Sequence, residues 1–138
     1  MCIRDRAAAA GADDALAAEL EEAASDPSSD PLVVADLLRA AADLSVEPTD
    51  RARRLADAVA TLLVHGEIRR ATASEPEIEH LGPGARRDEL LGRLALLSGR
   101  LTRARGLLAS AHSALARTGR GDGVGAVSYT HLTLPTKA

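Results

Sequence analysis

The chain has 138 residues and a formal net charge of −3, with 17 basic and 20 acidic side chains, and aromatic residues make up only 1% of it. This composition argues against direct nucleic-acid binding, because neither phosphate neutralisation nor base stacking is well supplied. No run approaches the roughly 18 to 20 apolar residues of a membrane span, and a single cysteine, Cys2, cannot form an internal disulfide framework. We therefore expect a cytoplasmic protein without membrane contacts.

The two ends of the chain differ in composition from everything between them. Residues 7–126 contain no Lys, Asn, Gln, Phe, Tyr, Trp, Cys or Met, whereas the single Met, Cys, Tyr and Lys lie in the ends MCIRDR and VSYTHLTLPTKA. Back-translated, these ends resemble the two orientations of one sequencing adapter. We therefore interpret residues 1–6 and 127–138 as adapter-derived and exclude them from the prediction of the fold. Residues 7–126 would then be an internal piece of a longer gene.

Helix signals begin directly after the adapter-like start of the chain. Residues 7–25 are Ala-rich and acidic, and Leu16, Leu20 and Ala24 recur at a helical spacing that predicts a helix with a thin apolar face. Residues 26–29, which read DPSS, predict a turn.

Asp30 and Pro31 predict the start of a second helix. Asp accepts hydrogen bonds from free backbone N–H groups at a helix start, and Pro suits the first turn. We expect this helix to end near Ser45. Its apolar face comprises Val34, Leu37, Leu38, Ala41 and Leu44.

The clearest amphipathic pattern lies in a third helix, which starts at residues 47–50 (EPTD) and runs to Gly66. A short helix from Glu67 to about Ala73 should follow, and Pro76 limits it because Pro is excluded from a helix interior. We expect residues 74–84 to be irregular, with a Gly-Pro-Gly turn at 82–84. The apolar positions of the third helix are Ala52, Leu55, Ala56, Val59, Leu62 and Leu63.

Residues 88–116 predict a helical hairpin that reverses at Gly99, because Gly tolerates the left-handed backbone that commonly follows a helix. Four glycines within 119–126 then predict a flexible linker. We prefer the linker to a nucleotide-binding loop or an adhesion tripeptide at 119–123 (GRGDG). The hairpin's apolar positions are Leu90, Leu91, Leu94, Ala95 and Leu97 in its first helix, and Leu101, Ala104, Leu108, Ala111 and Leu115 in its second.

The turn of this hairpin is preceded by a similar phrase earlier in the chain. The earlier phrase contains Gly66, Ile68 and Ala71. The hairpin has residues of the same kinds at the same spacing, namely Gly99, Leu101 and Ala104. Self-similarity at a period of roughly 20 to 50 residues is typical of repeat arrays. The pattern resembles the tetratricopeptide repeat (TPR), which the second copy matches best through Leu91-Gly92, Gly99, Ala104, Leu108 and Ala111. The first copy departs from it at Glu75-Pro76, and the family's usual aromatic residues are absent.

A longer resemblance covers residues 30–116. The phrase DLLRAAADLSVEPTDRARRL, together with the later hairpin, is similar to the helical-repeat middle region of large actinobacterial regulators of the LuxR family. The residues that carry the match are Arg39-Ala40-Ala41, Asp43-Leu44-Ser45, Pro48, Arg51-Ala52 and Arg53-Arg54-Leu55. In that family an ATPase module precedes the array and a DNA-binding helix-turn-helix follows it. The resemblance implies that both lie outside this chain.

No motif for catalysis, cofactor binding or metal binding stands out. There is no phosphate-binding loop, and residues 7–126 have no lysine to supply one. The histidines His65, His80 and His112 lack metal-ligand spacing. We expect His65 to lie near a helix C-terminus, where the dipole favours a cation, and His112 to border the core.

Charged side chains on the predicted helices have two interpretations. The carboxylates could support acid–base chemistry, and the arginines could bind a phosphate or an acidic partner. We favour solvated helix surfaces for both groups, because basic and acidic residues alternate along the helices. The carboxylates are Glu19, Glu21, Glu22, Asp88 and Glu89, and the arginines are Arg51, Arg53, Arg54, Arg86 and Arg87.

Together these observations predict an all-α protein of four to six antiparallel helices in a TPR-like right-handed array of about two repeats. The expected organisation is an Ala/Glu-rich helix and turn at 7–29, the helical-repeat segment at 30–118 and the linker at 119–126. Its expected function is non-catalytic binding of a protein or small effector on the concave face, within a LuxR-family transcriptional regulator. The alternative is a stand-alone TPR-like adaptor.

No catalytic, cofactor-binding or metal-ligating residue is assigned, and ATP is expected only in the parent's ATPase module. DNA would be contacted only through the parent's helix-turn-helix. Short arrays are marginally stable and expose apolar faces. We therefore also expect self-association through faces beside Val34, Leu38 and Leu107.

Overall fold

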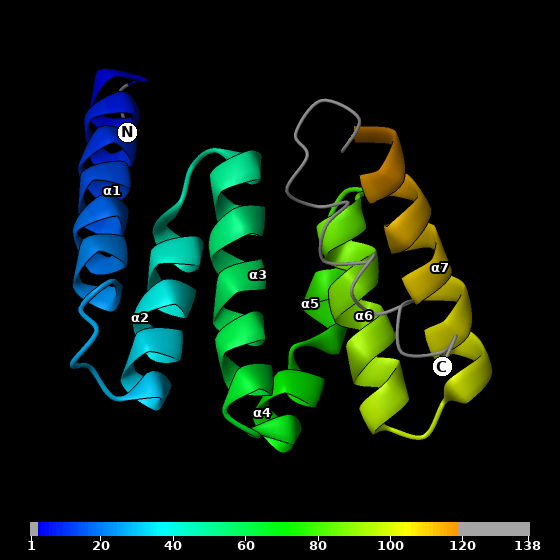
Figure 1. Ribbon diagram of the computed structural model, residues 1–138. Coiled ribbons are helices and arrows are strands. Elements are labelled where there is room, and N and C mark those ends of the chain that lie inside the picture. The colour runs from blue at the N-terminus through cyan, green and yellow to red at the C-terminus, as the bar shows by residue number, and fades with distance from the viewer. Residues whose placement is uncertain (1–2, 119–138) are drawn as a thin grey trace. The chain divides into compact units, whose positions relative to one another are not determined.

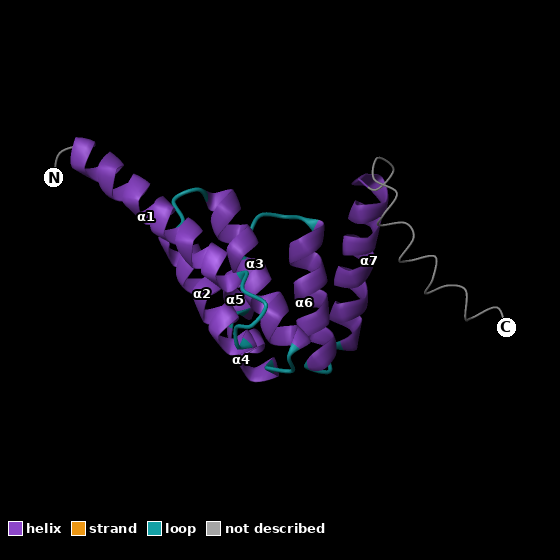
Figure 2. Cartoon of the chain, turned by 60° about the vertical axis from the view of Figure 1, so that its left-hand side comes forward, coloured by secondary structure: helices purple, strands orange, loops and turns teal. Residues whose placement is uncertain are grey.

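A computed structural model describes residues 3–118, with side chains from residue 10 onward, and this range contains only helices and loops (Figures 1 and 2). The all-α prediction is confirmed for this range. The predicted linker at 119–126 and the end at 127–138 lie outside the described residues. The helices are α1 (Ile3–Ala24), α2 (Pro31–Leu44), α3 (Pro48–Val64), α4 (Ile68–Ala73), α5 (Glu75–Glu79), α6 (Ala85–Leu97) and α7 (Leu101–Thr118).

The chain divides into two compact units at Leu81 and Gly82. The first unit holds α1 to α5 and the second holds α6 and α7. The domain boundaries expected at 7–29 and 30–118 rest on composition and resemblance, and they stay predictions.

In the first unit, α1, α2 and α3 run antiparallel, and α2 packs against both of its neighbours (Figure 1). A cluster of Ala24, Leu38 and Ala58 joins the three helices, and Val34 and Leu37 pack against it. The two alanines leave room for Leu38 because they have no side-chain atoms beyond Cβ. Leu38 is therefore buried, and our expectation of an exposed apolar face beside it is wrong.

The contact face of α1 differs from the predicted one. Leu16 is 46% exposed, whereas its neighbour Ala17 is fully buried and Ala24 is 8% exposed. Ala24 is thus buried as predicted, whereas Ala17 takes the buried position expected for Leu16. An alanine face lets α1 lie close to α2, which a leucine at the contact would prevent.

The helix boundaries around α2 and α3 follow the predicted signals. Asp30 Oδ1 accepts a hydrogen bond from the backbone N–H of Leu32 at 2.8 Å, and Pro31 begins α2. Ser45 caps the end of that helix, and Pro48 begins α3. These predictions are confirmed.

Residues 74–84 are more regular than predicted, because they contain α5. Pro76 lies in the first turn of this helix, where the absent N–H has no helical partner to lose. Ile78 of α5 is fully buried, so tertiary packing stabilises the turn. The described residues therefore form seven helices rather than four to six.

The two turns at Gly66 and Gly99 have the same geometry. Gly66 has a φ of 76° and Gly99 a φ of 75°. At the first turn the N–H groups of Gly66 and Glu67 donate to the carbonyls of Leu63 and Leu62, at 3.2 and 2.9 Å. This paired arrangement is the Schellman motif, which ends a helix by satisfying its last carbonyls.

The second turn repeats both of these hydrogen bonds. Gly99 N–H donates to the carbonyl of Leu96 at 3.1 Å, and Arg100 N–H donates to the carbonyl of Ala95 at 2.8 Å. An alanine that follows each glycine in the next helix is buried, Ala71 in the first unit and Ala104 in the second. The sequence period thus corresponds to a repeated local structure.

In the second unit α6 and α7 form an antiparallel hairpin (Figure 1). The closest approach is at Gly92, where an added Cβ would lie 2.7 Å from Leu108 Cγ and 3.3 Å from the Leu108 backbone nitrogen. Gly92 therefore acts as the socket for Leu108. The buried apolar residues of this unit are Leu90, Leu91, Leu94, Ala95, Ala104 and Ala111.

Three leucines predicted to face the hairpin contact are exposed instead. Leu97 is 52% exposed and Leu101 is 65% exposed, because they flank the turn, where neither helix extends far enough to cover them. Leu115 is also exposed. Ser110 Oγ donates to Asp88 Oδ2 at 2.8 Å, and in this register Leu115 lies beyond the first residue of α6, since a helix rises about 1.5 Å per residue.

The positive φ at the second turn predicts opposite effects for two Gly-to-Ala substitutions. Gly99→Ala should lower the free energy of unfolding by about 1 kcal/mol, because an L-residue is strained in the left-handed region. Gly106 lies within α7 with open space around it, so Gly106→Ala should raise the free energy of unfolding by about 0.5 kcal/mol or more. Urea denaturation measures both. Equal changes of the same sign would contradict the turn assignment.

The close contact between Gly92 and Leu108 predicts that the effects of substitutions at these two positions on the free energy of unfolding are not additive. Gly92→Ala should destabilise the protein by about 1 to 3 kcal/mol through overpacking against Leu108. In a Leu108→Ala background the same substitution should cost much less, since the obstructing atoms are gone. A double-mutant cycle by urea denaturation gives the coupling, and additive effects would refute the contact.

Candidate functional site

A pocket of about 260 Å³ lies within the first unit, between α2, α3 and α4. Four of its lining residues are apolar and four are polar. The apolar ones are Ala35, Ala58, Leu62 and Ala73, and the polar ones are Asp36, Arg39, Arg70 and Ser74. The pocket thus places a small apolar surface beside three charged side chains and one hydroxyl group.

The helical spacing of these residues explains why they meet. Asp36 and Arg39 lie one turn apart on α2, and Arg70 and Ser74 lie one turn apart along α4 and its cap. Such pairs share one face of a helix. Because Ala71 is buried, α4 packs on α3, and from there Arg70 reaches Asp36 of α2.

Ser74 is the most enclosed polar group of the pocket. It is 2% exposed, and its Oγ accepts a hydrogen bond from Arg39 Nη1 at 2.9 Å. The same residue ends α4 and precedes α5. Arg39 therefore connects the pocket to the junction of these two short helices.

Each arginine of the pocket is ion-paired with a carboxylate from a different helix. Arg39 of α2 pairs with Glu77 of α5, and Arg70 of α4 pairs with Asp36 of α2. All four side chains remain substantially exposed to solvent. Exposed pairs of this kind are weak, because water competes for both charges.

Arg39, Arg70 and Ser74 were not predicted as a site from the sequence. Arg39 belongs to the family-like phrase on α2, and Arg70 lies on another helix. The same-face spacing of Asp36 with Arg39, and of Arg70 with Ser74, was visible in the sequence. The side-chain contacts that join α2 to α4 and Ser74 were not.

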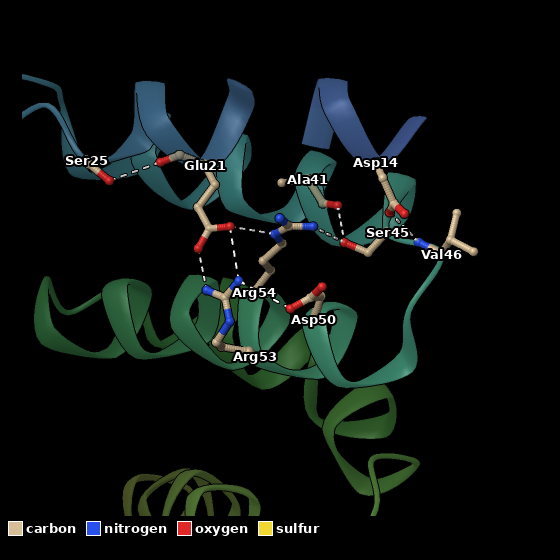
Figure 3. Close-up of polar contacts among 9 residues, drawn as sticks. All are labelled: Asp14, Glu21, Ser25, Ala41, Ser45, Val46, Asp50, Arg53 and Arg54. Carbon is tan, nitrogen blue, oxygen red and sulfur yellow. Dashed lines mark hydrogen bonds and ion pairs between the residues drawn. The ribbon is translucent and has the colours of Figure 1, made fainter. Parts of the chain in front are cut away.

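A second polar cluster joins α1 to α3 around Glu21 (Figure 3). Glu21 pairs with Arg53 and, at 2.7 Å, with Nε of Arg54. The Arg54 Nη1 group donates to Ser45 Oγ at 2.6 Å, and that hydroxyl donates to the Ala41 carbonyl at 2.7 Å. Arg53 also lies 3.6 Å from Asp50.

This cluster corrects the expectation of a solvated surface charge for Arg54 and Glu21, whereas Arg53 remains 47% exposed. The Arg54 side chain is only 7% exposed and Glu21 is largely covered. A buried guanidinium requires a carboxylate partner, because an unpaired buried charge is strongly destabilising. The cluster thus has a structural role, which the sequence could not reveal because the partners stand far apart along the chain.

None of the other predicted charged residues lines the pocket. Arg51 and the acidic residue Glu19 are exposed, and Glu22 is exposed as well. Arg86 lies 3.7 Å from Glu89, and Arg87 lies 3.1 Å from Asp88.

The environment of Glu21 shifts its acid–base equilibrium. Its hydrogen bond with Arg53, assisted by Arg54 and opposed by partial desolvation, lowers the pKa of Glu21 from 4.5 to about 2. The same hydrogen bond raises the pKa of Arg53. Both shifts favour the ionised pair.

The histidines lie in three different places. His65 caps the end of α3, as expected, and His80 Nδ1 lies 2.6 Å from the Pro76 carbonyl oxygen. His112 is exposed rather than at the core border, because its neighbour Ala111 occupies the buried position. Within residues 3–118, no three His, Cys, Asp or Glu side chains converge as a metal site would require.

Comparison with known proteins yields no relative: no family model, curated protein or solved structure matches this chain. Among the helices that the structure describes, none is both long enough and apolar enough to span a bilayer.

The lowered pKa of Glu21 predicts how stability depends on pH. Since the folded-state pKa lies below the ordinary value of 4.5, the pair's contribution is complete above pH 4.5 and is lost as the pH falls toward 2. Glu21→Gln should abolish this part of the acid dependence. It should also lower the unfolding free energy at pH 7 by about 2 kcal/mol or more, because Arg54 stays buried without its partner.

The matched control is Glu22→Gln, at an exposed neighbouring position. This variant should keep the wild-type pH profile. Urea denaturation at several pH values between 2 and 7 measures both variants. An unchanged acid profile in Glu21→Gln would contradict the assigned pair.

Proposed function

We propose that this chain is a non-catalytic, protein- or effector-binding segment of a TPR-like helical repeat, within a LuxR-family transcriptional regulator. The observation that carries the proposal is the pair of turns at Gly66 and Gly99, which share φ, both capping bonds and the buried alanine that follows. Repeated helix–turn–helix units stack into arrays whose surfaces bind ligands and proteins.

The polar groups of the pocket favour binding over catalysis. Its carboxylate, Asp36, is ion-paired with Arg70, and the Ser74 hydroxyl accepts a hydrogen bond from Arg39. A nucleophilic serine would instead need a neighbouring base to accept its proton. Arg39 is the partner of Ser74, and a guanidinium that is always protonated cannot serve as that base.

The regulator assignment rests on the phrase that spans α2 and α3. Its residues include Arg39, Ser45 and Arg54, which make cross-helix hydrogen bonds in the structure. These residues of the phrase therefore link neighbouring helices, which supports its interpretation as a structural feature of the array. In this proposal the segment binds its ligand and alters communication between an ATPase module and a DNA-binding helix-turn-helix elsewhere in the parent.

The alternative is a stand-alone TPR-like adaptor. It is favoured by the same repeated turns, and by the departure of α5 from the regular pattern after the first copy. Such an adaptor would bind partners through the same helices but would have neither ATPase nor DNA-binding modules.

Genomic sequence on both sides of residues 7–126 distinguishes the two. A phosphate-binding loop encoded upstream and a helix-turn-helix encoded downstream are expected for the regulator. If genomic sequence instead runs unbroken through MCIRDR and VSYTHLTLPTKA to a stop codon, the adapter interpretation is wrong. If the flanking genomic sequence encodes neither module, the stand-alone adaptor is the supported interpretation.

A further inference from the structure

We propose that the pocket between α2, α3 and α4 binds a small aliphatic monocarboxylate. Arg70 and Arg39 would receive its carboxylate, and the alanine and leucine floor would receive its chain. This inference rests on the proposed binding function and names the chemistry of the ligand. It is carried by the charges, the apolar floor and the volume of the pocket.

The charges of the lining favour one negative charge on the ligand. Arg39 and Arg70 supply two positive charges, which Glu77 and Asp36 neutralise in the structure, although Glu77 lies outside the lining. A monocarboxylate that takes the place of Glu77 balances the remaining charge. A phosphate dianion would bring one more negative charge than the carboxylate of Glu77 that it replaces. It would also lie close to the Asp36 carboxylate, which would repel the phosphate.

The guanidinium groups retain donors for such a ligand. The ion pair with Asp36 engages Nη2 of Arg70, which leaves Nη1 and Nε to donate hydrogen bonds to a carboxylate. Arg39 donates through Nη1 to Ser74 and through Nη2 to Glu77. Because both ion pairs are solvent-exposed, a ligand carboxylate can share or replace either partner at little cost.

The rest of the pocket is apolar and small. Ala35, Ala58, Leu62 and Ala73 form its non-polar lining. Its volume of about 260 Å³ lies just below the range of roughly 300 to 1,000 Å³ for drug-sized ligands. A short hydrocarbon chain therefore fits better than a large cofactor.

Ser74 gives the site a rigid edge. It is almost fully buried and fixed by Arg39. Arg39 in turn links α2 to α5 through Glu77. A ligand that displaces Glu77 from Arg39 would remove this link between α2 and α5, while the buried Ile78 still holds α5.

The test is a titration of the full chain with sodium hexanoate at constant ionic strength, followed by two-dimensional amide NMR. We expect saturable shifts grouped at Asp36, Arg39 and Ser74, with a Kd on the order of 1 mM or tighter. Hexylamine hydrochloride supplies the same chain with the opposite charge, and should produce no saturable shift at these positions. Sodium phosphate should bind more weakly than hexanoate.

Two variants test the assigned residues. Arg70→Gln should weaken hexanoate binding at least about tenfold, as expected for losing a charged, two-point contact. The matched control Arg69→Gln removes an exposed arginine that does not line the pocket, and should leave the Kd unchanged. Ala73→Leu keeps both arginines but adds bulk at an exposed position of the pocket lining, and should also weaken binding. Far-UV circular dichroism verifies that each variant is folded.

Three results would overturn the proposal. These are the absence of saturable shifts with hexanoate, equal losses in Arg70→Gln and Arg69→Gln, or phosphate binding as tight as hexanoate. If an acidic pentapeptide binds the same amides and hexanoate does not, the pocket serves a protein partner instead. Each of these would leave the repeat-segment proposal open to its own genomic test, so the two failures are distinguishable.

Discussion

Close approach between helices through small side chains is the constraint on which the described structure depends. The chain has no Phe or Trp, so large aromatic groups cannot fill the space between helices. Ala24 and Ala58 instead receive Leu38 in the first unit, and Gly92 receives Leu108 in the second. Packing of this kind tolerates little change in volume, because neighbouring atoms are already in contact.

Polar contacts complete the packing where the apolar surface is small. The contact face of α1 consists mainly of alanine, and Glu21 adds a charged link to Arg53 and the buried Arg54. A buried ion pair adds modest net stability, but removal of either partner is costly. The Glu21 cluster therefore specifies the position of α1 and makes it sensitive to acid.

The pocket uses the same residue types for a different purpose. Arg54 is enclosed and serves the fold, whereas Arg39 and Arg70 are exposed and held by weak ion pairs. The buried hydroxyl of Ser74 and the short alanine side chains shape the cavity beside them. Because Arg39 and Arg70 are exposed, a ligand carboxylate can replace the protein carboxylate that is paired with either of them.

The sequence by itself determined the helical class and most helix boundaries, since these depend on local chemistry. Asp30, Pro48, Gly66 and Gly99 act on neighbouring backbone atoms, and their effects were correctly predicted. Tertiary structure decided which side chains are buried, because burial depends on helices distant in sequence. Leu16 is exposed while its smaller neighbour Ala17 is buried, and Leu101 is exposed because it flanks the turn. Pro76 lies in the first turn of α5, which forms because Ile78 finds a buried position. The contacts of Glu21 with Arg54, and of Arg39 with Ser74, join residues that are distant along the chain, and only the packing of the helices brings them within hydrogen-bonding distance.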